Sequence, residues 1–189
     1  SFALGLIVLL TGCPAEEPVG PEPRVDGWLY TAGNRIEHAD GRLWQGRGVN
    51  LHDTRSCLAC TASAPDVDAV KRRIDLAVND WGATFLRLSL EAYAEGNGAE
   101  SWRSLLEDEA YRDAVQAIVD YVGTKPGVYI MVSVWMDPSL DDNGWPTAET
   151  AVLWARLTGM FRDDPHVIFG VAHEPRANND GAKDADCAA

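Results

Sequence analysis

A short apolar run that ends in charged residues is the stretch of the sequence best suited to chemistry. Residues 167–172 are apolar or glycine, and His173, Glu174 and Pro175 follow directly. Such a run is typical of a parallel strand buried on both faces, and proline, which has no N–H, ends regular pairing. In barrels of alternating strands and helices, catalytic side chains stand at the carboxyl ends of strands. We therefore interpret Glu174 as a candidate general acid/base; the alternative is a loop carboxylate paired with Arg176.

The second candidate is Arg87, the single charged residue of an apolar strand predicted at residues 84–90. A buried guanidinium needs a partner, because an isolated charge is very costly to remove from water. At the carboxyl end of a strand the expected partner is an active-site carboxylate, whose pKa the guanidinium would lower. A structural ion pair with a helix residue is the alternative.

Polar and aromatic residues follow two other predicted strands. Asn50 and His52 lie at the end of the first strand of the repeating part, and their neutral hydrogen-bonding groups suit sugar hydroxyls. Trp135 lies near the end of the third strand, and Trp145 lies in the loop that follows. We interpret each indole either as a surface that stacks on a sugar ring or as part of the core or rim.

These residues need a scaffold that brings the ends of successive strands together. From Gly46 onward, short apolar runs alternate with amphipathic segments, which predicts an α/β fold with a parallel sheet and right-handed crossovers. No glycine-rich phosphate loop follows any strand, which disfavours a nucleotide-binding open sheet. Since a full (β/α)8 TIM barrel takes about 250 residues, we expect about its first four β/α units. The predicted strands are 47–51, 84–90, 127–136 and 167–172, and the predicted helices are 66–81, 107–122 and 147–161.

Two details of this scheme concern the first helix and the segment before the barrel. The helix predicted at 66–81 places Leu76 and Trp81 on its apolar face. Two short strands on either side of Gly33 predict an antiparallel hairpin. We expect this hairpin to cap the bottom of the barrel, in a structural role.

Composition limits the class of partner. The 189 residues carry 16 basic and 29 acidic side chains, a formal net charge of −13, which argues against a nucleic-acid partner. The charge fits a protein that acts on a neutral substrate, and seven tryptophans are many for this length. We expect a monomer that needs no cofactor and no metal.

The amino-terminal residues resemble an export signal. Residues 1–13 begin with an apolar run too short to span a bilayer, and the run ends in Leu10–Cys13, which resembles a bacterial lipobox. Cys13 would then carry the lipid, although an ordinary signal with an incidental cysteine is the alternative. Residues 14–24 are rich in proline and glutamate and predict an extended tether, followed by the catalytic domain at 25–189. We expect an exported protein that touches the membrane through its lipid anchor alone.

A pair of cysteines lies in the loop after the first strand of the repeating part. The spacing of Cys57 and Cys60 would suggest a redox or zinc site in a cytosolic protein. In an exported chain it favours a disulfide that stiffens the loop. Zinc would need a second pair of ligands, and none is evident nearby in the sequence.

Four segments in this order resemble the first half of a glycoside hydrolase family 5 catalytic domain, the cellulase family of clan A. The resemblance implies a (β/α)8 barrel that hydrolyses β-linked polysaccharide with retention, with Glu174 as acid/base and Arg87 beside the nucleophile. The family's nucleophile is a glutamate on the seventh strand, which would lie beyond residue 189. His173 stands where the family has asparagine in contact with the sugar 2-hydroxyl, and imidazole differs from an amide in shape and charge. The four segments are Arg47–His52, Phe85–Leu88, Ser133–Pro138 and His173–Pro175.

Two other functions are consistent with the same residues. A metal-dependent barrel hydrolase would use His52, Asp53, His173 and Glu174 as ligands. A non-catalytic carbohydrate-binding protein is favoured by the histidine at 173. We also expect the 189-residue chain alone to be inactive and poorly stable, because half a barrel leaves apolar strand edges unpaired.

Overall fold

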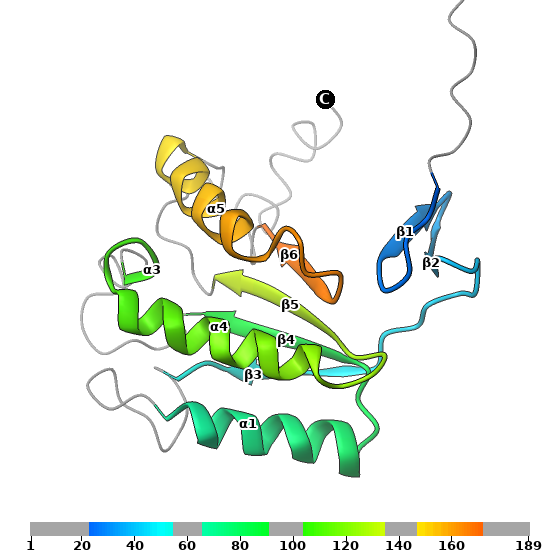
Figure 1. Ribbon diagram of the computed structural model, residues 1–189, viewed down its shortest axis with the longest axis horizontal. Helices are drawn as coiled ribbons and strands as arrows, with labels where there is room; N and C mark the ends of the chain where they lie inside the picture. The colour runs from blue at the N-terminus through cyan, green and yellow to red at the C-terminus, as the bar shows by residue number, and fades with distance from the viewer. Residues whose placement is uncertain (1–22, 55–65, 91–103, 135–146, 172–189) are drawn as a thin grey trace, which may run out of the picture.

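The computed structural model describes residues 23–54, 66–90, 104–134 and 147–171 (Figure 1). Its main feature is a four-stranded parallel sheet in the order β3-β4-β5-β6. The spatial order follows the sequence order without reversal, as in a barrel and unlike a doubly wound open sheet. The predicted parallel sheet is therefore confirmed. The strands are β3 (Gly48–His52), β4 (Phe85–Leu90), β5 (Tyr129–Val134) and β6 (Val167–Gly170).

Helices connect successive strands, as the alternating pattern predicted. They are α1 (Val67–Asp75), which continues into the π-helical segment η1 (Leu76–Asp80), then α3 (Ser104–Glu107), α4 (Glu109–Gly123) and α5 (Ala148–Phe161). Polar residues before the three longer helices cap backbone N–H groups that have no intrahelical partner. Asp66 accepts from Ala69 N at 2.8 Å, Asp108 accepts from Tyr111 N at 3.1 Å, and Thr147 begins α5 with a capping box.

One part of the prediction for the first helix is wrong. Val70 and Ile74 are buried, but Leu76 and Trp81 are exposed, Trp81 by 77%. Leu76 lies two positions after Ile74 and so on the opposite side of the helix. Trp81 N donates to Leu76 O at 3.3 Å, a bond that spans five residues. This wider turn rotates Trp81 out of the apolar stripe that a regular helix would have extended.

The two faces of the sheet differ in chemistry. Side chains alternate between faces along a strand, and one face carries the apolar core. The strand residues on that face are buried in one cluster with residues of α1, α4 and α5, so these helices cover it. On β6 only Val167 is buried, and the next three residues are half-buried, so burial on both faces is not seen along the described strand. The buried strand residues of the helix-covered face are Leu51, Leu86, Leu88, Leu90, Ile130, Val132, Val134 and Val167.

The predicted hairpin is present and lies where the sequence placed it. β1 (Leu29–Ala32) pairs with β2 (Arg35–His38). His38 of β2 lies with its ring centroid 6.3 Å from that of Tyr129. Trp44, whose backbone N–H donates to Ile36 O of β2, packs edge-on against Phe85 and Tyr129, each at 5.6 Å between ring centroids. These two residues begin β4 and β5, so the hairpin lies at the amino-terminal end of the parallel strands (Figure 1).

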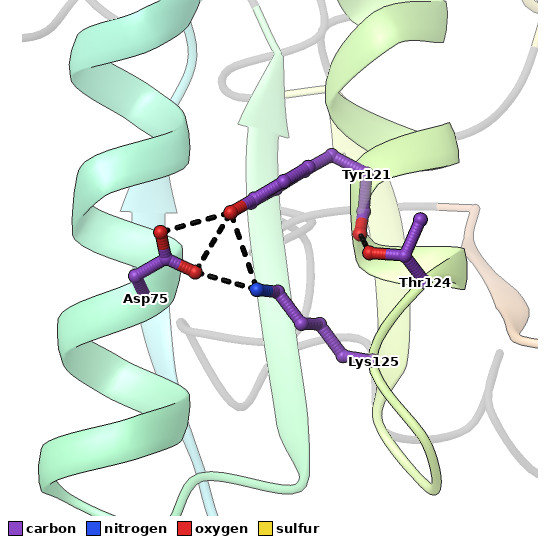
Figure 2. A network of polar contacts seen from close by, with 4 residues as sticks. All are labelled: Asp75, Tyr121, Thr124 and Lys125. Atoms are coloured by element: carbon purple, nitrogen blue, oxygen red, sulfur yellow. Dashed lines mark hydrogen bonds and ion pairs between the residues drawn. The ribbon is translucent and has the colours of Figure 1, made fainter.

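A polar network joins α1 to α4 at this same end of the sheet (Figure 2). Lys125 Nζ contacts Asp75 Oδ1 at 2.6 Å, and the Tyr121 hydroxyl donates to both Asp75 oxygens at 2.9 and 2.8 Å. A hydrogen bond from Lys125, and to a smaller extent one from Tyr121, holds the pKa of the Asp75 carboxyl below its usual range. The bond to Asp75 in turn raises the pKa of Lys125. The network fixes the two helix ends against each other, far from the carboxyl edge of the sheet.

Within the described ranges, no helix combines the length and the apolar character needed to cross a membrane.

Candidate functional site

The candidate site lies on the sheet face that the helices leave uncovered. Asn50 pairs in register with Arg87, and two residues further along β3, His52 pairs with Ser89. Because side chains two residues apart share a face, all four point away from the helix-covered core. Asn50 and His52 are exposed, Arg87 is half-buried and Ser89 is buried. The structure therefore brings Asn50, His52 and Arg87 together on adjacent strands. Arg87 is the third residue of β4 and does not lie at its carboxyl end, where the sequence prediction placed it.

Arg87 makes a contact that the sequence did not predict. Its Nε donates to Ser133 Oγ at 3.0 Å, across to the neighbouring strand β5. Ser133 is only 1% exposed. The sequence alternative for Arg87 was an ion pair with a helix residue, whereas this partner is a hydroxyl of the sheet. Alternation along β5 was the signal that could have shown it, since Ser133 shares a face with Met131, the register partner of Arg87.

Asp53, the residue after β3, is held on the other side of the sheet. The Tyr111 hydroxyl on the first turn of α4 donates to Asp53 Oδ2, and both side chains are buried. Asp53 therefore faces the helix layer, and His52 faces the uncovered side. A metal site built from both residues would need them on one side, so this arrangement disfavours the metal-dependent alternative. Within the residues that the structure describes, no group of three or more His, Cys, Asp or Glu side chains is placed to hold a metal ion.

The other predicted site residues lie outside the described residues, and their roles stay predictions. β6 runs parallel to β5 and ends at Gly170, the register partner of Ser133. The chain thus leaves β6 at the same carboxyl edge where Arg87 and Ser133 meet, a few residues before Glu174. The predicted residues outside the description are Cys13, Cys57, Cys60, Trp135, Trp145, His173 and Glu174.

A protein-family model matches most of the chain. The family model described as Cellulase (glycosyl hydrolase family 5) matches residues 40–188. No curated protein sequence matches the chain.

Two solved structures with bound cellotetraose match the chain. A β-glucanase from Saccharophagus degradans in complex with cellotetraose has a TM-score of 0.51 and 21% identity, over 77% of this chain and 41% of that chain. The catalytic domain of endoglucanase Cel5A from Thermobifida fusca in complex with cellotetraose has a TM-score of 0.47 and 20% identity, over 79% and 43%. The chain spans less than half the length of both structures. The likeness to the first supports a shared fold, in which the four strands belong to a (β/α)8 barrel.

Proposed function

Because the chain belongs to glycosyl hydrolase family 5, we propose that the whole protein is a retaining endo-acting glycoside hydrolase of β-linked polysaccharide, such as β-glucan or mannan. The observation that carries this proposal is the polar face of the sheet. Asn50, His52 and Arg87 share that face on adjacent strands, and β6 leads toward Glu174 at its carboxyl edge. Polar groups that converge at the carboxyl edge are what a barrel enzyme needs.

The proposed chemistry uses two carboxyl groups and the proton of one of them. Glu174 donates its proton to the glycosidic oxygen as the bond to the leaving sugar breaks, while the nucleophile carboxylate bonds to the anomeric carbon. Water then attacks that carbon, Glu174 takes a proton from the water, and the nucleophile is released. The nucleophile would lie beyond residue 189, about 5–5.5 Å from Glu174. Arg87 would hold the nucleophile ionised through its positive charge.

Substrate binding is assigned to the polar and aromatic residues around these groups. Asn50 and His52 would hydrogen-bond sugar hydroxyls, and both side chains are exposed on the uncovered face. Trp135 and Trp145 would stack on sugar rings, and His173 would meet the 2-hydroxyl. The S. degradans structure holds cellotetraose, which supports a β-glucan chain as the ligand to test first.

The rest of the chain organisation belongs to the same proposal. We assign residues 25–189 to the first half of the barrel, which the coverage of the S. degradans structure supports. Cys13 would carry a lipid, residues 14–24 would tether the domain to the envelope of a bacterial cell, and Cys57 and Cys60 would form a disulfide. The protein would act as a monomer, and the isolated 189-residue chain would be inactive.

The test is the Glu174→Gln variant of the full-length protein, assayed for release of reducing ends from β-glucan and mannan. Loss of a general acid/base costs about 10²- to 10⁴-fold, so we expect kcat/KM to fall by that much while glycan binding remains. Asp163→Asn is the matched control, because Asp163 is an exposed carboxylate after α5, at the other end of the strands. Full activity of Glu174→Gln would refute the assignment. Loss of wild-type activity with a chelator would favour the metal-dependent alternative, and binding without turnover would favour a carbohydrate-binding protein.

A further inference from the structure

We infer that Ser133 is a positioning residue for Arg87. Its hydroxyl accepts a hydrogen bond from Nε and thereby sets the direction in which the rest of the guanidinium faces. The inference rests on the proposed function, because it concerns the carboxylate that Arg87 would hold during glycoside hydrolysis.

The contact draws the arginine side chain toward the carboxyl edge of the sheet. Arg87 pairs in register with Met131, and Ser133 lies two residues further along β5. The bond from Nε to Ser133 Oγ measures 3.0 Å, so the guanidinium extends beyond its own register position. Ser133 is 1% exposed, so water does not compete with Arg87 as a donor to its hydroxyl oxygen. A bond in such a shielded place fixes orientation better than one at the surface.

The choice of nitrogen decides which edge of the guanidinium is presented to a ligand. A guanidinium is planar and carries its N–H donors in a rigid fork. With Nε bonded to Ser133, the edge formed by the two Nη groups is fixed in direction relative to β5. Parallel N–H donors on that edge match the two oxygens of a carboxylate. Ser133 therefore orients Arg87 for an end-on, two-point contact with the nucleophile.

The hydroxyl of Ser133 is uncharged, which matters for the positive charge of Arg87. A serine hydroxyl accepts the bond without cancelling the positive charge of Arg87. A carboxylate at 133 would share that charge and reduce its effect on the pKa of the nucleophile. Ser133 thus orients the cation without itself neutralising the positive charge.

Ser133 is itself held by the next strand. Its register partner on β6 is Gly170, and a Cβ built there would lie 2.8 Å from Ser133 Cβ and 3.0 Å from Met131 Sδ. Ser133 therefore packs directly on the backbone of β6. The hydroxyl that meets Arg87 is placed by two strands and not by a flexible loop.

The test compares Ser133→Thr with Ser133→Val in the full-length protein, with carboxymethylcellulose as substrate. The two variants have the same shape and differ in whether a hydroxyl is present. We expect kcat of the Val variant to be about 10-fold below that of the Thr variant, with KM within about two-fold, because a misdirected catalytic group lowers the rate of the chemical step. Both variants are then compared again in an Arg87→Lys background, where there is no Nε to orient and the Thr-to-Val ratio of kcat should fall below about two.

The outcomes separate this inference from the proposed function. Equal kcat for Thr and Val, or the same ratio in both backgrounds, would overturn the role of Ser133 while leaving the hydrolase assignment in place. Should neither variant fold, as judged by circular dichroism, wild type and Ser133→Ala are compared in the same two backgrounds, with the same expectations. A wild-type protein that hydrolyses no β-linked glycan would overturn the proposed function and this inference with it.

Discussion

The buried bond between Tyr111 and Asp53 makes a prediction that does not depend on substrate. Tyr111 is 2% exposed and Asp53 is fully buried, and they join the first turn of α4 to the end of β3. The Tyr111→Phe variant removes the hydroxyl and keeps the ring. It leaves a buried carboxylate with one donor fewer, and it opens no cavity larger than an oxygen atom.

The expected loss of stability is large because only the donor of the hydrogen bond is removed, and the buried acceptor stays in place. A buried acceptor that loses its donor costs about 1–3 kcal/mol, and a charged acceptor lies toward the upper end. We therefore expect the free energy of unfolding to fall by about 2 kcal/mol. In an Asp53→Asn background the acceptor is neutral, and the same Tyr111→Phe change should cost less, with a coupling of about 0.5–2 kcal/mol.

The assay is urea unfolding of the full-length protein at pH 7, followed by circular dichroism. Tyr30→Phe is the matched control, because the Tyr30 hydroxyl contacts the backbone N–H of the exposed residue Val25, which water can replace. The control should change the free energy of unfolding by less than about 0.5 kcal/mol. Equal losses in both variants, or no loss in Tyr111→Phe, would show that the buried bond does not anchor the strand end.

Two further predictions concern pH and the core. Lys125 and Tyr121 lower the pKa of Asp75 in the folded state. The stabilisation that Asp75 gives the fold is therefore fully present above its unfolded-state pKa of about 3.9, and it is lost as the pH falls through the lower folded-state pKa. Wild type should therefore exceed Asp75→Asn in unfolding free energy at pH 6, and the difference should shrink as the pH falls below the unfolded value. A difference that stays constant with pH would contradict this reason. In the core, Leu88→Ala should lower the free energy of unfolding in urea by about 2–5 kcal/mol, because Leu88 is fully buried. Val152→Ala, at a residue that is 57% exposed, should lower it by less than about 1 kcal/mol.

The architecture could be predicted from the sequence because each element carries its own local signal. Apolar runs gave the four strands, amphipathic spacing gave the helices, and Asp66, Asp108 and Thr147 now cap three of those helices as their residue types allow. The exceptions were Leu76 and Trp81, which were expected on the apolar face of the first helix and are exposed. For Trp81 the reason is that no local pattern marks where a helix widens into a π turn.

The site could be predicted only in part, because contacts between strands depend on register. Asn50, His52 and Arg87 were recognisable as polar residues of otherwise apolar strands, although only His52 ends its strand. That Arg87 meets Ser133 follows from the alignment of β4 with β5, and the bond between Tyr111 and Asp53 joins residues 58 positions apart. Alternation along β5 shows which face Ser133 takes, but the partner of each side chain depends on residues far away in sequence.

The most direct measurement of the central claim is the configuration of the first sugar product, followed by proton NMR during hydrolysis of a β-glucan by the full-length protein. Two carboxyl groups acting through a covalent intermediate predict that the β anomer forms first and the α anomer appears later by mutarotation. An α anomer formed first would show a single displacement by water and would contradict the roles assigned to Glu174 and to the carboxylate beside Arg87.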